Sequence, residues 1–311
     1  MPNYTQYNTN AASLLDAHVG AYMAWYHVAI VLYVLGAAIF LAYWFFRNRA
    51  TVIAGVVFTV GGLACQAASL GVRWVYSGHV PWNDLYGSLS VVAFCSIVLF
   101  LIFGARFNIW FAGPIVLAVT DALLAYGQGW NKGLEPLVPS LKNNYWIYYH
   151  VPIVLAAYAS FLIGFSTSIL YLLKKRDEDR SLAAAGKSVG AAVATAPSGS
   201  PLRAWLDVVP PSNALEVITY RVIAIGEILL TVGIILGSLW AHDAWGSYWQ
   251  NDPKELAALT CWIWYAAYLH LHTRPSFRGP RLAWMSIAGF GVVLFCYFGV
   301  NIWISGLHSY K

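Results

Sequence analysis

The sequence predicts an all-α integral membrane protein with about eight transmembrane helices and an extracytoplasmic loop rich in tryptophan. Two observations carry this class. Of the 311 residues 59% are hydrophobic and only 10% are charged, and apolar runs of membrane-spanning length recur along the chain. No stretch between the runs could form a soluble domain, and the runs show no internal repeat. We therefore expect one polytopic membrane domain over residues 1–311.

Windows of about 20 apolar residues mark the predicted helices in order along the chain. The first follows a polar segment that has no Lys or Arg, and so lacks the basic region, and that also lacks the small-residue cleavage site of a secretory signal; we therefore expect it to be retained. An even number of spans places both termini on the same side of the membrane. The predicted spans are 22–46, 51–72, 85–103, 109–127, 147–173, 217–241, 255–272 and 282–304.

The distribution of basic residues predicts the orientation. Of the 18 Lys and Arg residues, 13 fall in the turns after the first, third and seventh spans and in the segment 174–221. The positive-inside rule makes that face cytoplasmic, which leaves both termini and the loops 128–146 and 242–254 outside. We favour a bacterial plasma membrane over a thylakoid membrane.

The segment 174–211 opens with Lys-Lys-Arg-Asp-Glu-Asp-Arg and continues in Ala, Gly, Ser and Pro, a composition that cannot build a core. We predict a flexible cytoplasmic linker. The net charge of +5 has its excess in this segment and in short turns. The charge therefore indicates topology and gives no reason to expect binding to nucleic acid.

The four cysteines fall singly inside apolar spans, and no Cys-x-x-Cys pair occurs. Buried structural thiols are the favoured interpretation. The same pattern excludes a c-type cytochrome, which needs Cys-x-x-Cys-His, and a thiol-disulfide carrier. Any thiol chemistry is expected from a partner or a substrate.

The loop before the seventh span is dense in aromatic residues. Trp245 and Trp249 would share a face if their segment were helical, and Asp252, Pro253 and Glu255 have the spacing of N-cap, N1 and N3 in the helix that follows. Two interpretations are open from these residues alone. The rings form either an ordinary interfacial belt or a platform for a flat apolar ligand.

The histidines are predicted at two depths. His79, His150, His242 and His308 come at outer helix ends, with His18 and His27 on the same side. His270 and His272 end the seventh span, about 22 Å of helix away, near the cytoplasmic leaflet. A single histidine of this kind is usually an interfacial residue that bonds a neighbouring carbonyl.

His150 and His308 together suit a different role, because both could lie over the tryptophan loop. Paired imidazoles beside an aromatic surface are typical of haem iron ligation. Zinc fits less well, since the chain has no His-Glu-x-x-His motif, no nearby cysteine ligand and only Asp243 as a carboxylate at ligand spacing.

Three stretches resemble the tryptophan-rich (WWD) haem-handling family of cytochrome c biogenesis, most closely its CcsA (ResC) branch. They are Trp-Gly-Ser-Tyr-Trp-Gln-Asn-Asp-Pro-Lys-Glu at 245–255, Thr-Cys-Trp-Ile-Trp-Tyr-Ala-Ala-Tyr-Leu-His at 260–270, and Gly-Leu-His-Ser-Tyr at 306–310. The segments 78–89 and around His150 also resemble sequences of this family. The first two spans and the linker carry no family motif.

The resemblance implies a function in cytochrome c maturation. Members act with a CcsB (ResB) type membrane partner, move haem b as a transported substrate to an outer bis-histidine site, and attach it by thioether bonds to the reduced CxxCH motif of apocytochrome c. This is a cytochrome c haem lyase (holocytochrome c synthase) activity of the complex. Thiol-reducing proteins are expected upstream, to keep the substrate cysteines reduced.

The resemblance also assigns residues. His150 and His308 match the outer axial ligands of the haem iron, and His270 matches an inner histidine that receives haem first, the second inner histidine coming from the partner. Trp245, Trp249 and Asp252 match the signature loop, which also holds Tyr248. Lys254 is a candidate partner for the haem propionates.

One position departs from the family pattern. Asn251 stands where a third tryptophan is usual, which makes the predicted aromatic surface smaller.

Two other classes remain as alternatives. A haem b electron-transfer subunit would hold both histidine ligands on facing helices inside the bilayer. A solute transporter would use intramembrane charges such as Asp121 and Glu227, although neighbouring helices could satisfy both carboxylates.

Overall fold

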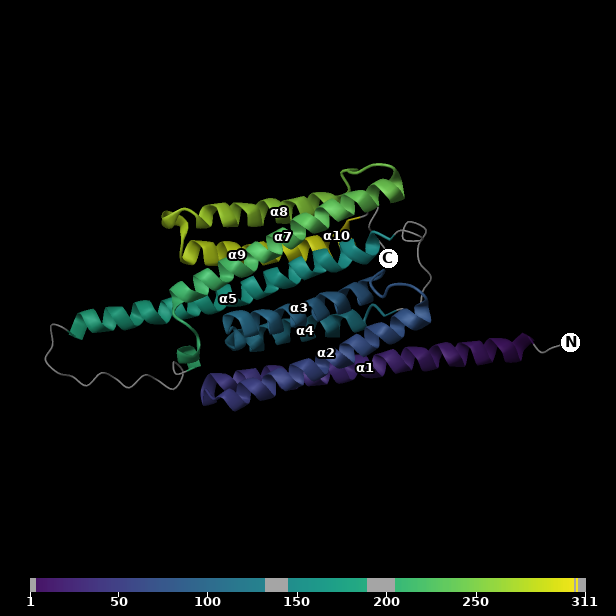
Figure 1. The fold of residues 1–311 in the computed structure, drawn as a ribbon, viewed down its shortest axis with the longest axis horizontal. Coiled ribbons are helices and arrows are strands. Elements are labelled where there is room, and N and C mark those ends of the chain that lie inside the picture. Colours follow the sequence, from purple (N-terminus) through teal and green to yellow (C-terminus); the bar gives the residue numbers. More distant parts are fainter. Residues whose placement is uncertain (1–3, 132–144, 189–204, 305, 307–311) are drawn as a thin grey trace.

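The computed structural model describes residues 4–131, 145–188, 205–304 and 306. Within these residues the chain is helical, with turns and no strand, and the long helices run side by side along one axis (Figure 1). The helices are α1 (Tyr4–Phe46), α2 (Arg49–Ser77), α3 (Leu85–Phe107), α4 (Gly113–Gln128), α5 (Ile147–Ser188), α7 (Ser212–Trp245), α8 (Pro253–His272), α9 (Pro280–Leu294) and α10 (Val300–Trp303). A π-helical turn, Phe295–Gly299, joins α9 to α10, and short 3-10 turns occur at Trp110–Ala112, Trp205–Val208 and Pro275–Phe277.

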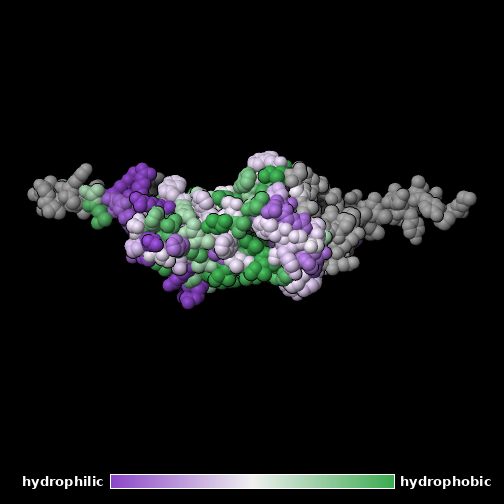
Figure 2. Space-filling view, turned by 90° about the horizontal axis from the view of Figure 1, so that it is seen from above, coloured by the Kyte–Doolittle hydropathy of each residue, from purple (hydrophilic) through white to green (hydrophobic). Residues whose placement is uncertain are grey.

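The chain is a multi-pass membrane protein. Seven helical segments are long and apolar enough to span a bilayer, the last running from α9 to the end of α10. The remaining predicted span, the seventh (255–272), corresponds to α8, whose 20 residues pack against α7 and α9 although its composition is more polar than that of the other seven. Hydrophobic residues cover the middle of the visible face, and hydrophilic residues lie toward its ends (Figure 2). The predicted fold class is confirmed.

Helix α5 lies at the centre of the bundle. It packs against α3, α7 and α9, and 72% of its most apolar window is buried, against 22% for α1 and α2. One core cluster joins α1, α3 and α4 to the middle of α5, and a second joins α3, α5, α7, α8 and α9. The central helix therefore links the two halves of the protein.

The helix turns separate into two ends, as the predicted spans require. The turns after α1, α3 and α8 lie at one end of the bundle, together with the C-terminal half of α5 and the start of α7 (Figure 1). These are the segments in which the sequence concentrates its basic residues. We call the opposite end, where α7 ends and α8 begins, the outer end. Which compartment it faces is a prediction from the charge distribution.

Helix α5 is longer than predicted and continues through the first 15 residues of the segment 174–211. Its charged run consists largely of good helix formers, and Lys175 pairs with Asp179 one turn later at 2.7 Å. Glu178 accepts hydrogen bonds from the backbone N–H and hydroxyl of Ser212, and so ties this helix to the start of α7. Residues 189–204 of the predicted linker lie outside the described residues.

The intramembrane thiols and carboxylates have different surroundings. All four cysteines are free thiols, and Cys261 and Cys296 are fully buried, as a structural role predicts. The sequence left open that neighbouring helices supply hydrogen-bond donors to the carboxylates of Asp121 and Glu227. Glu227, however, is 7% exposed, and neither carboxylate oxygen has a hydrogen-bond partner among the described residues; the same holds for Oδ1 of Asp121.

Candidate functional site

The tryptophan loop begins where α7 ends. Gly246 adopts the left-handed conformation at φ 78°, and its N–H donates to the carbonyl of His242 at 2.8 Å, which closes the helix after Trp245. Residues 246–252 are therefore a loop and not a helical turn. The condition under which Trp245 and Trp249 would share a helical face is not met, because the glycine terminates the helix between them.

Asp252 starts α8 as the spacing predicts. Its side chain accepts from the N–H of Lys254 at 3.0 Å, Pro253 occupies the first helical position, and Oε2 of Glu255 accepts from the N–H of Asp252 at 3.2 Å and of Gln250 at 2.9 Å. This reciprocal capping box satisfies backbone donors that the helix cannot satisfy itself. The end of the tryptophan loop is thus fixed to α8.

Asp252 also lies against the C-terminal segment. It is 5% exposed, and a Cβ atom added to Gly306 would stand 2.6 Å from its Oδ1 and 3.1 Å from Cδ of Pro253. A side chain at this position would therefore force Asp252 or the backbone of Gly306 to move. His308 follows two residues later and lies outside the described residues.

The aromatic rings of the loop occupy two environments. Trp245 packs edge-on against Trp240 of α7, with ring centroids 4.8 Å apart. Trp249 and Tyr248 are 37% and 56% exposed, and Tyr248 stacks on His242 at 4.3 Å. An exposed aromatic surface therefore lies beside a packed one.

Asn251 orients Trp249. Its φ of 56° is left-handed, a conformation that asparagine tolerates better than bulky residues do, and its Oδ1 accepts from Nε1 of Trp249 at 2.9 Å. The departure from the family pattern thus places a hydrogen-bond acceptor beside the remaining exposed tryptophan.

His150 lies in the first turn of α5 and faces α7. Its Nδ1 is 2.8 Å from the carbonyl oxygen of Gly233, and its ring lies over Trp240 at 6.0 Å with an interplanar angle of 17°. A carbonyl only accepts, so Nδ1 must carry the proton of this bond and Nε2 is the nitrogen suited to bind a metal. Trp240 therefore joins His150 to Trp245.

Trp240 is the residue of this group that the sequence analysis missed. It is 3% exposed and looks like an ordinary member of the sixth predicted span. Its position becomes informative only with Gly233 and Gly237, because the intervals of four and three residues put all three on one face of α7.

Gly237 sets the space available to the imidazole. A Cβ added there would lie 2.6 Å from Cε1 of His150, so Gly237→Ala is expected to push the ring away from Trp240. Because the resemblance implies that this imidazole binds haem iron, we expect haem bound by the purified protein to fall about ten-fold, a cost within the range for overpacking. The measurement is the haem absorbance per mole of protein. Gly291→Ala is the matched control, since nothing lies within 4 Å of a Cβ at that position of α9.

Lys254 points into the helix bundle. Its Nζ donates to Oδ1 of Asn301 in α10 at 2.8 Å, and Asn301 in turn donates to the carbonyl of Tyr297 at 2.6 Å. The ammonium group thus holds the N-terminal turn of α8 to α10. An anionic ligand at Lys254 would have to join or replace this contact.

The two inner histidines differ. His270 is exposed in the last turn of α8, whereas the ring of His272 stacks on Tyr220 at 4.1 Å and its Nε2 lies 3.6 Å from Glu216. His270 is 18 positions from Asp252, which corresponds to about 27 Å of helix. The structure thus places His270 and His150 at opposite ends of the bundle.

His79 lies in the turn between α2 and α3 and is 9% exposed, with its Nδ1 3.1 Å from the carbonyl of Val80. This contact with the adjacent residue is sufficient to explain the position of the His79 imidazole as part of the turn.

Comparisons with known proteins agree on one family. The model of the family described as "Cytochrome C assembly protein" matches residues 82–308. The chain is 36% identical over 274 residues to the "Cytochrome c biogenesis protein CcsA" of Synechococcus elongatus, covering 79% of this chain and 83% of the relative. It is 35% identical to the protein of the same name from Parasynechococcus marenigrum over 283 residues, which cover 87% and 90% of the two chains. Similar values hold for the protein of that name from Guillardia theta, at 36% identity and coverages of 80% and 83%.

The fold also occurs in a solved structure. The protein titled "Cytochrome c Heme Lyase CcmF" superimposes with a TM-score of 0.62 over 90% of this chain, at 15% sequence identity. This chain spans 46% of the length of that protein. At this identity the likeness concerns the arrangement of the helices.

Proposed function

The chain belongs to the cytochrome c assembly protein family, and from this premise we propose that it is the haem-handling subunit of a cytochrome c haem lyase. Its general role is in cytochrome c maturation. In our proposal it works with a CcsB (ResB) type membrane protein, receives haem b at the inner end of the bundle, and presents it at the outer end for attachment to apocytochrome c.

The observation that carries the proposal is the convergence of distant segments at the outer end. Trp240 connects His150 of α5 to Trp245 at the end of α7, while Asp252 connects the tryptophan loop to Gly306 near the C-terminus. Two residues of backbone reach at most about 7 Å, so a ligand supplied by His308 would have to lie near Asp252. The family expectation of a bis-histidine site over the tryptophan loop is compatible with this arrangement.

In the proposed site the chain's own residues bind and orient the substrate. His150 and His308 hold the iron, and the exposed rings of Trp249 and Tyr248 offer an apolar surface for one face or edge of the porphyrin. The reaction itself is an addition. Each substrate thiol adds across one vinyl group, so that sulfur bonds to one carbon and the hydrogen ends on the other, with no net oxidation. Fixed orientation of thiols and vinyl groups is what such a site can contribute.

The inner end would serve to receive haem. His270 is exposed on α8, so a ligand from a neighbouring membrane protein could approach the same iron from the opposite side. We propose a CcsB-type partner beside α8, the basic end in the cytoplasm, and a bacterial plasma membrane as the location. Residues 1–311 would form one polytopic domain.

The test is a covalent-haem stain of a reporter apocytochrome c expressed with this chain and its partner. We expect a stained reporter that resists denaturation, and no stain when this chain is omitted or when the two CxxCH cysteines of the reporter are replaced by serine. An unstained reporter beside a membrane protein that retains redox-active haem b would replace this proposal with the electron-transfer subunit.

A further inference from the structure

The turn between α2 and α3, residues 78–84, is held in one conformation from both sides. We call it the outer turn. Gly78 ends α2 in the left-handed conformation at φ 70°, and the carboxylate of Asp84 caps α3 by accepting from the N–H of Gly87 at 2.6 Å. The carbonyl of Pro81 lies so close to Gly87 that a Cβ there would stand 1.7 Å from its oxygen. The backbone of the turn is therefore packed directly on the first turn of α3.

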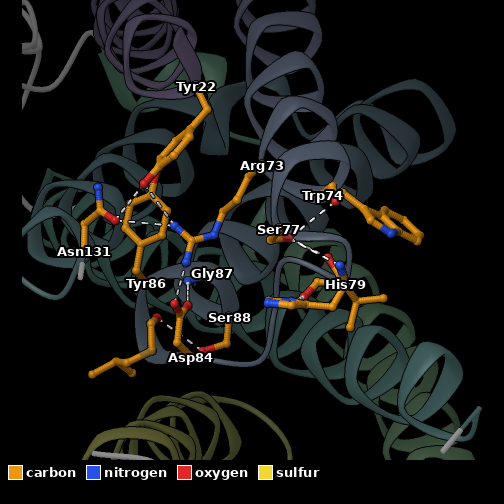
Figure 3. A network of polar contacts seen from close by, with 12 residues as sticks. Tyr22, Arg73, Trp74, Ser77, His79, Asp84, Tyr86, Gly87, Ser88 and Asn131 are labelled. Carbon is orange, nitrogen blue, oxygen red and sulfur yellow. Dashed lines mark hydrogen bonds and ion pairs between the residues drawn. The ribbon is translucent and has the colours of Figure 1, made fainter. Parts of the chain in front are cut away.

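A buried arginine anchors this turn. Arg73 is 2% exposed, and its Nη2 donates to Oδ2 of Asp84 at 2.5 Å, while its Nη1 lies 3.3 Å from the hydroxyl of Tyr22 and 3.4 Å from Oδ1 of Asn131 (Figure 3). The guanidinium also lies 4.7 Å from the ring centre of Tyr86. A buried charge persists only when it is paired and hydrogen-bonded, so this network fixes Asp84 and with it the end of the turn.

Val80 and Trp82 of the outer turn lie against the start of α5. Nε1 of Trp82 donates to the carbonyl of Ile147 at 3.2 Å, and Val80, Ile147 and Trp240 form one buried cluster with exposures of 2%, 5% and 3%. His150 follows Ile147 by three residues and therefore lies on the same side of the helix. The outer turn thus contacts the helix turn that carries the imidazole, and it shares one buried cluster with the indole over which the imidazole lies.

We propose that the outer turn is a positioning element for His150, with Trp82 as the positioning residue and Arg73 as its anchor. The inference rests on the proposed function, because it concerns the placement of an iron ligand. Trp82 touches the helix turn that carries the ligand and need not touch haem. The Arg73–Asp84 pair keeps the indole of Trp82 in a fixed position relative to the start of α5.

The test is Trp82→Phe, which removes the indole N–H and keeps an aromatic ring. We expect covalent attachment to the reporter, per amount of chain extracted from the membrane, to fall about three- to ten-fold, the range that corresponds to one net hydrogen bond. We also expect a shifted Soret band of the bound haem and recovery of attachment with added imidazole. Trp284→Phe is the matched control, because that indole is 61% exposed on α9.

Two results would overturn the inference: attachment and spectrum equal to wild type, or a loss that imidazole does not reverse. If the variant accumulates poorly, Val80→Ala tests the same contact by thinning the cluster over Ile147 and Trp240, with the same readouts. The proposed function is tested separately by removing His150 itself. Full attachment without that imidazole would refute the site, whereas wild-type behaviour of Trp82→Phe alone would refute only the positioning role.

Discussion

Replacing His150 with glycine is expected to abolish covalent attachment of haem to the reporter, and added imidazole is expected to restore it. The carbonyl of Gly233 and the ring of Trp240 hold this imidazole at the outer end, so its removal leaves a space of the right shape for the free base. Removing a group that only supports a metal ligand lowers metal affinity or activity about 10- to 100-fold. Removing the ligand itself should therefore lower attachment about 100-fold or more. The measurement is stained reporter with and without imidazole.

The same treatment of His308 should give the same pattern, since the proposed site uses both histidines. His27→Ala serves as the control, because that histidine is exposed on α1. Full attachment by the variant lacking both His150 and His308 would show that the reaction does not use this pair.

Replacing Asp252 with alanine should cause the second large loss, whereas Asp252→Asn should retain most of the attachment. The alanine variant loses the cap of α8, which is worth about 0.5–2 kcal/mol, and also the oxygen that lies against Gly306. The C-terminal segment would then lose its support beside the tryptophan loop. Asparagine keeps an oxygen at the same place and is an equally good cap.

The pair of variants separates two roles of this carboxylate. Reporter staining and the haem spectrum should be measured for both, with each chain's membrane level as reference. If the negative charge itself acted on haem or on the substrate, the asparagine variant would fail as completely as the alanine variant. That result would contradict a purely structural role for Asp252.

The features that the sequence predicted are those with a local cause. Apolar windows located the helices, and the Asp-Pro-x-Glu spacing located the start of α8, because capping depends on residues only three positions apart. Trp245 and Trp249 share no helical face for an equally local reason, since the left-handed Gly246 between them ends the helix. The length of α5 was underestimated because its charged run was interpreted by polarity rather than by helix propensity.

The contacts that build the outer end have no such local signature. Trp82 meets Ile147 across 65 positions, and Gly306 meets Asp252 across 54, so neither pair shows a pattern in one sequence. The burial of Arg73 between α1, α2 and α3 likewise depends on how those helices pack. Tertiary packing determines these positions. The hydrophobic periodicity and composition of one sequence do not predict which helices pack together.

The hydrogen bond from His150 to the carbonyl of Gly233 has a consequence for the order in which ligands would exchange. A metal-binding imidazole that donates its second N–H to a fixed acceptor is oriented and made more basic. In the proposed site His150 would therefore be the ligand that keeps its bond to iron, and His308 would be the ligand that the incoming histidine of the CxxCH motif replaces. The finished cytochrome could then leave without displacing the imidazole that α5 and α7 hold in place.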